Sequence, residues 1–155
     1  MHWIRTLALL FPVVGLASCE STHMDGGHNW KEGRNHLSWL AGVTHDDSEN
    51  AFTIGVDYEY RLNQRLGIGA VVEQATEDID ATTILAVADI HCTNYWIIQT
   101  GPGIELLDDE EEFVYRIGTL YEWEFDGYTL SPQVHYDITG DENAVIFALA
   151  FGYGF

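Results

Sequence analysis

The side chains with the clearest chemical potential are charged groups that recur at every second position. Successive side chains of a β-strand point to opposite faces, so Asp57, Glu59 and Arg61 share one face of an alternating segment. Carboxylates removed from bulk water need cationic or hydrogen-bonding partners. We therefore predict an internal polar network braced by arginine–carboxylate pairs. Its predicted members are Asp57, Glu59, Arg61, Glu73, Glu105, Arg116, Glu122, Glu124, His135 and Asp137.

Eight alternating segments separated by turn signals carry these groups. Short links join the segments, so we expect neighbouring strands to pair antiparallel. The last segment alternates bulky side chains with small ones up to Phe155 and is predicted to close against the first. The sequence thus predicts an all-β, eight-stranded, antiparallel up-and-down transmembrane β-barrel. The predicted strands are 36–44, 51–62, 66–74, 82–90, 95–106, 113–125, 128–138 and 144–155.

The two faces of these strands differ in a way that indicates which one meets lipid. One face carries bulky groups such as Trp39, Tyr115 and Trp123, and the other mixes charges with glycines such as Gly67 and Gly69. Glycines weaken strands but suit a narrow, filled lumen. We therefore expect the bulky face to point outward, with aromatic girdles at the membrane interfaces. The competing fold is a soluble, periplasmic lipocalin-like binding barrel, which places its apolar side chains inside.

Several strand sequences resemble those of small bacterial outer-membrane β-barrel proteins of the OmpA/OmpX type. The similar stretches are 101–105 (GPGIE), 116–118 (RIG) with 121–124 (YEWE), and 130–133 (LSPQ). The resemblance covers residues 35–155. It implies the barrel fold, a bacterial outer-membrane location, and outer-membrane lipid and lipopolysaccharide as surroundings. It implies no particular activity.

The N-terminal part resembles an export signal. Residues 1–19 combine Arg5 with an apolar stretch too short to span a bilayer. They end in Leu16-Ala17-Ser18-Cys19, which is similar to the lipobox of bacterial lipoproteins, with Cys19 as the lipidated residue. Ordinary signal cleavage beside a chance cysteine is the alternative. Residues 20–34 are predicted to form a flexible tether.

Charge is strongly unbalanced, with 25 Asp and Glu residues against 6 Lys and Arg residues. Such an anionic surface argues against nucleic acid as a partner. The acidic residues gather in the first, third, fifth and seventh links, around 46–49, 77–80, 108–112 and 140–142. In an even-stranded barrel with both termini in the periplasm, these links lie outside the cell. We expect them to hold divalent cations only loosely, because no EF-hand-like spacing is present.

No catalytic residue, metal site or cofactor is predicted, so we interpret the chain as a non-enzymatic protein with a structural, envelope-maintenance or surface-interaction role. The enzymatic alternative rests on His36 and Ser38, because lipid A deacylases are outer-membrane barrels that use a His and a Ser two residues apart. Both side chains here alternate with Leu37 and Trp39. They are therefore expected to face the lumen rather than the lipid. Conduction through the lumen is a further alternative, which eight strands leave little room for.

Overall fold

The computed structural model describes residues 34–46, 49–77, 80–107, 110–140 and 143–155. The predicted signal segment, Cys19 and all of the tether except Arg34 lie outside these described residues. Within them the regular structure consists of strands, and no described helix is long and apolar enough to cross a bilayer.

Nine strand segments build the fold, and each overlaps a predicted strand. Strands β2 and β3 extend further than predicted, because polar residues at their ends still pair with a neighbour, as Glu49 does with Asp46 and Glu77 with Ala51. The segments are β1 (Asn35–Asp46), β2 (Glu49–Arg61), β3 (Leu66–Glu77), β4 (Ala81–His91), β5 (Trp96–Leu106), β6 (Glu111–Tyr121), β7 (Trp123–Phe125), β8 (Tyr128–Ile138) and β9 (Asn143–Gly154).

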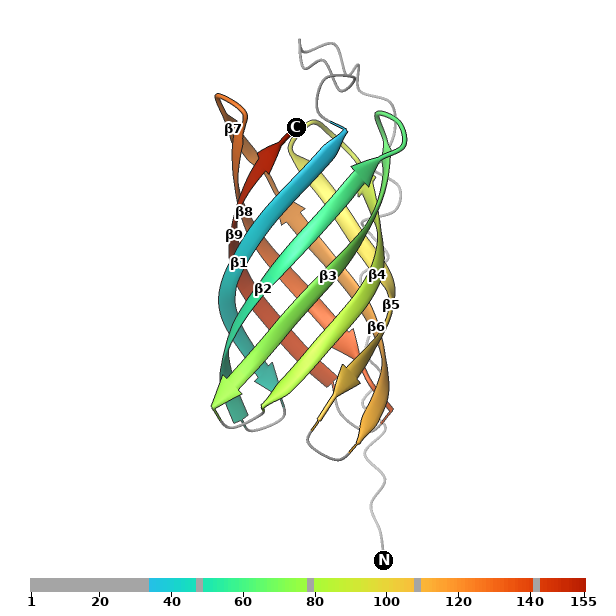
Figure 1. The fold of residues 1–155 in the computed structure, drawn as a ribbon, viewed down its shortest axis with the longest axis vertical. Helices are drawn as coiled ribbons and strands as arrows, with labels where there is room; N and C mark the ends of the chain where they lie inside the picture. The colour runs from blue at the N-terminus through green and yellow to red at the C-terminus, as the bar shows by residue number, and fades with distance from the viewer. Residues whose placement is uncertain (1–33, 47–48, 78–79, 108–109, 141–142) are drawn as a thin grey trace, which may run out of the picture.

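The strands form one closed antiparallel barrel (Figure 1). Neighbours in sequence pair along the sheet, and β1 pairs with β9 over eleven register positions from His36↔Gly154 to Asp46↔Ala144. The predicted closure of the last strand against the first is confirmed. The closed sheet has a stagger of ten residues. The register partner of Asn35 on β2, followed from strand to strand once round the barrel, leads back to β1 at His45. This stagger tilts the strands and sets the width of the lumen.

The sixth barrel strand is interrupted at Glu122, which separates β6 from β7. Both pieces pair with β8 in one continuous register, from Tyr115↔Ile138 to Phe125↔Tyr128. That register places Tyr121 opposite Pro132, which has no backbone N–H to donate and so weakens the ladder there. Segments β6 and β7 are therefore one barrel strand, and the predicted count of eight strands is confirmed.

The link between β7 and β8 is a two-residue turn formed by Asp126 and Gly127. Both residues have positive φ, 54° for Asp126 and 88° for Gly127. Positive φ at both central positions defines the type I′ turn, whose twist matches that of antiparallel strands. The Asp-Gly pair predicted as a link from the sequence thus sets this hairpin.

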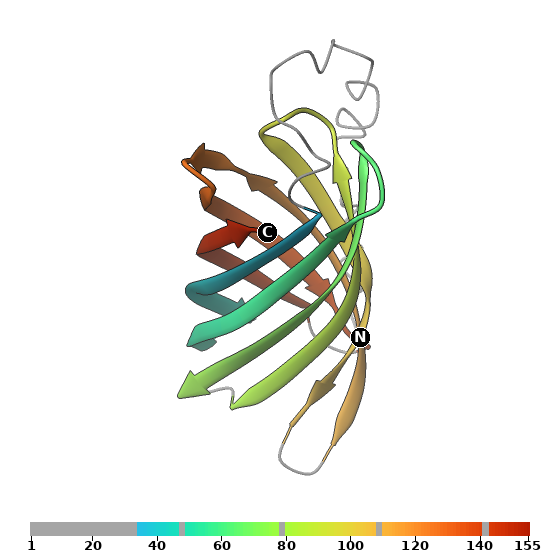
Figure 2. The same ribbon diagram turned by 45° about the horizontal axis from the view of Figure 1, so that its top comes forward.

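The two ends of the barrel differ in composition. The turns that follow β2, β4 and β7 lie at one end together with the C-terminus (Figures 1 and 2). We call this end the C-terminal rim. The opposite end, which we call the acidic rim, carries Asp46, Glu49, Asp80, Glu110, Glu111 and Glu112 at or beside the strand ends.

Bulky apolar side chains cover the outer wall. They alternate along each strand with buried ones, as in β9, where Phe147, Leu149 and Phe151 are exposed and Ile146 and Ala150 are buried. Aromatic rings also pack together near the C-terminal rim, where Tyr128 stacks on Phe151 at 5.6 Å and lies tilted against Tyr153 at 5.3 Å between ring centroids. A monomer in water does not expose so continuous an apolar surface. The predicted assignment of the faces is confirmed, and the lipocalin-like alternative, which needs the reverse arrangement, is wrong.

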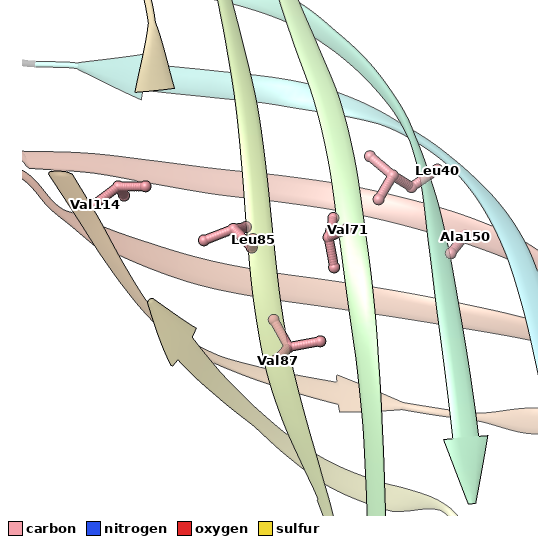
Figure 3. Packing of buried hydrophobic residues seen from close by; sticks show 6 residues of the cluster. All are labelled: Leu40, Val71, Leu85, Val87, Val114 and Ala150. Atoms are coloured by element: carbon pink, nitrogen blue, oxygen red, sulfur yellow. The ribbon is translucent and has the colours of Figure 1, made fainter. Parts of the chain in front are cut away.

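A small apolar layer fills the middle of the lumen. It contains Leu40, Val71, Leu85, Val87, Val114 and Ala150 (Figure 3). Along β1, Leu40 lies between Ser38 and Thr44, and along β4, Leu85 and Val87 lie between Thr83 and Asp89. The layer therefore separates two polar regions, one toward each rim.

Candidate functional site: the polar lumen

Arg116 is the centre of the polar region toward the acidic rim. Its guanidinium group is fully buried and makes two forked contacts with carboxylates. Nη1 and Nη2 each donate to Glu73 at 2.6 Å, and Nε and Nη2 each donate to Asp137 at 2.7 Å. Asp137 is the register partner of Arg116 on β8, whereas Glu73 reaches it from β3 across the lumen. This triad connects β3 with β6 and β8, and no backbone ladder joins β3 directly to either of those strands.

A second ion cluster lies toward the C-terminal rim. The Glu59 carboxylate lies 2.6 Å from His91 Nε2 and 3.5 Å from Arg61 Nε, and Arg61 Nη2 lies 3.4 Å from His91 Nδ1. Glu59 belongs to β2 and His91 to β4, so the carboxylate crosses over β3 to reach its partner. Gly67 of β3 permits this crossing, because a Cβ there would overlap the Glu59 side chain. The contact between Glu59 and His91 therefore requires a glycine at position 67.

Asp57 and Asp89 form a different arrangement between that cluster and the apolar layer. The amide Nε2 of Gln99 donates to Asp57 Oδ2 at 2.9 Å and to Asp89 Oδ1 at 3.0 Å. The second oxygens, Asp57 Oδ1 and Asp89 Oδ2, are buried and have no hydrogen-bond partner. Two buried carboxyl groups thus share one neutral amide.

The other members of the predicted network each make separate contacts. Thr83 Oγ1 donates to Glu105 at 3.0 Å, and Glu122 lies 3.9 Å from His36 Nε2. His135 Nε2 lies 2.9 Å from Gln133 Oε1 and is not in contact with an acidic partner among the described residues. Glu124 is exposed in β7 at the C-terminal rim, on the same face as its buried register partner Thr129.

The polar lumen residues absent from the predicted network include Asp89, His91 and Gln99. Both faces of the segment 82–90 are apolar in its middle, which left its inward face undecided, and His91 was assigned to a link. The structure extends β4 to His91, and alternation from the exposed Ile90 then places Asp89 and His91 inside. Gln99 follows by the same alternation from Ile98.

His36 and Ser38 both point into the lumen at the C-terminal rim. His36 Nε2 lies 2.8 Å from Thr129 Oγ1, and Ser38 is buried. No hydrogen bond joins His36 to Ser38 within the described part of the chain. The arrangement expected of a base and a nucleophile facing the lipid is therefore not formed by these two residues.

The lumen leaves little open space. A cavity of about 20 Å³ lies toward the C-terminal rim, lined partly by Ser38, Asp57 and Asp89. Another of about 30 Å³ lies toward the acidic rim beside Glu73, Arg116 and Asp137. Volumes of this size hold one or two water molecules. Across the described ranges, no three His, Cys, Asp or Glu side chains converge as a metal site.

A much larger hollow lies on the outside of the barrel. It has a volume of about 850 Å³ and is lined mainly by apolar groups, including Ala41, Trp96, Tyr121, Pro132 and Leu149. These residues follow one row across β1, β9, β8, β6 and β5 on the bulky face. The hollow belongs to the surface that meets acyl chains, and among the polar lumen residues Gln133 also lines it.

Fold and lumen together define a class: a closed, eight-stranded antiparallel barrel with an apolar exterior and a filled polar interior. Solved structures with this fold include the N-terminal β-barrel domain of OprF from Pseudomonas aeruginosa, with a TM-score of 0.64, 13% identity, and coverage of 79% of this chain and 99% of that one. Neisserial surface protein A gives a TM-score of 0.58 and 12% identity, covering 78% of this chain and 97% of the other.

The outer membrane protein Ail of Yersinia pestis is also similar, with a TM-score of 0.52 and 14% identity over 80% of this chain and all of the other. The chain therefore has the fold of small bacterial outer-membrane barrels, and the fold implied by the sequence resemblance is confirmed. No protein-family model matches the sequence, and no curated protein sequence matches it.

Proposed function

We propose that this protein is a non-conducting barrel of the bacterial outer membrane, with a structural, envelope-maintenance or surface-interaction role. The filled lumen supports this proposal best. Arg116 joins Glu73 and Asp137 across the lumen, and an apolar layer separates cavities of only about 20 and 30 Å³. A solute would have to displace packed side chains and buried ion pairs in order to pass.

The location follows from the outer wall and the structural neighbours. An apolar belt with stacked aromatic rings near one rim suits lipid and its interface. In the proposed orientation the C-terminal rim faces the periplasm and the acidic rim faces outward. There its carboxylates would hold Mg²⁺ or Ca²⁺ loosely and connect the protein to lipopolysaccharide phosphates.

Conductance recordings test the proposed role. The full chain, folded into planar lipid bilayers, is expected to give no steady single-channel current, whereas a porin of known conductance inserted in the same membranes gives one. Steady, ion-selective currents that scale with the amount of protein would contradict a non-conducting role. Glu73→Gln in the same assay is expected to give at most brief openings, because it weakens only one arm of the Arg116 triad.

Membrane fractionation tests the location separately. The protein is expected to need detergent for extraction, and its migration on gels should change after boiling, as folded barrels resist denaturation at room temperature. Recovery as a soluble protein without detergent would refute a membrane location. Mass analysis of lipid A with and without the protein addresses the enzymatic alternative, and an unchanged acyl pattern agrees with a non-enzymatic role.

A further inference from the structure

The lumen between the apolar layer and the C-terminal rim contains two buried carboxyl groups, Asp57 and Asp89, that the arginines do not contact. Arg116 lies on the other side of the layer and is engaged by Glu73 and Asp137. Arg61 is engaged by Glu59 and His91. Within the described part of the chain, neither Asp57 nor Asp89 forms an ion pair with either arginine.

These two carboxyl groups are deeply buried and incompletely partnered. Asp57 is 7% exposed and Asp89 is 3% exposed. Gln99 satisfies one oxygen of each, and the remaining Asp57 Oδ1 and Asp89 Oδ2 have no partner. Buried carboxylates are normally paired, hydrogen-bonded or bound to a cation, because transfer from water without compensation is costly.

Both unpartnered groups line the same small cavity. Its volume of about 20 Å³ is room for one water-sized occupant. The hydroxyl-bearing Ser38 and Ser131 also line it, so the wall offers further oxygen atoms. At its rim side the cavity meets His36 and Glu122, whose side chains keep 18% and 12% exposure. Their partial exposure makes this side of the cavity the one nearest the aqueous phase at the C-terminal rim.

We propose that this cavity binds one monovalent metal cation of the sodium class through Asp57 Oδ1 and Asp89 Oδ2. A hard cation prefers oxygen ligands, and these two oxygens are the unsatisfied ones. A divalent ion is disfavoured, because Ca²⁺ takes six to eight oxygen ligands and Mg²⁺ demands near-octahedral geometry. One positive charge offsets part of the buried negative charge. A bridging water would satisfy the same oxygens without offsetting the charge of ionised carboxylates, and a bound proton would remove part of that charge.

Thermal unfolding of the full chain in detergent tests the site. The protein is compared in sodium chloride and in N-methylglucamine chloride at equal ionic strength, with divalent ions removed by a chelator. Because a ligand that binds only the folded state stabilises it, the unfolding temperature should be a few degrees higher in sodium. The double variant Asp57→Asn, Asp89→Asn should lose this difference. The matched double variant Glu49→Gln, Asp80→Asn at the acidic rim should retain it.

Equal unfolding temperatures in the two salts would overturn the proposal and mean that a proton or a water occupies the pair. A sodium effect that persists in Asp57→Asn, Asp89→Asn would overturn it as well. If that variant does not fold, the ²³Na resonance of the wild-type protein decides. Broadening that saturates at one ion per barrel and disappears on addition of excess lithium supports the site, and unchanged line width overturns it.

Discussion

At the residue scale, two features allow charged groups to pair inside the barrel. Long side chains span the lumen, and glycines leave room for them to cross a strand. The Arg116 side chain is long enough for its guanidinium group to contact Asp137 on the neighbouring β8 and Glu73 on the distant β3 at the same time. Glu59 reaches His91 only because Gly67 leaves the intervening position empty. Charged residues and glycines are therefore parts of one arrangement.

Removal of the Arg116 charge should destabilise the barrel strongly. Arg116→Met leaves Glu73 and Asp137 buried without their cation, so we expect the free energy of unfolding to fall by about 3–5 kcal/mol. Urea titration in lipid vesicles measures the loss. Arg65→Met, at an exposed link position, is the control and should change stability by less than about 0.5 kcal/mol. A similarly small loss for Arg116→Met would show that the triad does not brace the barrel.

At the element scale, hairpin turns and prolines decide where the ladders are continuous. Asp126 and Gly127 form a turn whose backbone twist fits the flanking strands. Pro132 interrupts the pairing of β6 and β7 with β8 without shifting its register. The ladder between β4 and β5 is likewise interrupted opposite Pro102 and Gly101. Both prolines lack the N–H that the ladder would use.

Gly127→Ala should weaken the β7–β8 hairpin. The φ of 88° at Gly127 is unfavourable for an L-residue with a side chain, so we expect a loss of about 1–2 kcal/mol in the free energy of unfolding. Gly140→Ala is the matched control, since an added Cβ meets nothing within 4 Å and φ there is not positive. Chemical denaturation of both variants compares them. Equal effects of the two substitutions would argue against a strained turn at Gly127.

At the scale of the whole molecule, the barrel has an inside-out distribution of side chains compared with a water-soluble protein. Exposed groups such as Trp39, Ile68 and Phe147 cover the wall, while Arg116, His135 and Gln99 are among the most buried side chains. This distribution is stable only where hydrocarbon surrounds the belt and the closed ladder satisfies the backbone. The same closure brings Glu73 and Arg116 together from opposite walls.

A charge placed on the lipid-facing wall should have an effect that depends on depth. Leu149→Arg, at an exposed position in the middle of β9, should cost about 2–4 kcal/mol, because the guanidinium enters the apolar belt. Asn143→Arg lies on the same face at the first residue of β9, near the acidic rim, and should cost about 1 kcal/mol or less. Refolding yield and denaturant unfolding in vesicles measure both. Equal costs would contradict a membrane belt across the middle of β9.

Much of the fold was predictable because a barrel strand has a period of two. Alternation identified every strand region and the outward face of all but the segment 82–90, and the terminal run up to Phe155 predicted the closing strand. Where both faces are apolar, as around Leu85, the period carries no information, and Asp89 and His91 were missed. Alternation gives the face of a strand but not its height relative to the rim, so the exposure of Glu124 at the C-terminal rim could not be predicted.

The sequence by itself determined the strand count, the direction of the faces of most strands and the composition of both rims, because these depend on alternation and on short-range turns. Only the tertiary structure decided which lumen groups meet, because the stagger of the closed sheet sets which residues from different strands reach the same height. It joined Glu73 to Arg116 across the lumen and left Asp57 and Asp89 sharing one amide. Contacts between walls depend on barrel closure, and no local pattern in the chain encodes them.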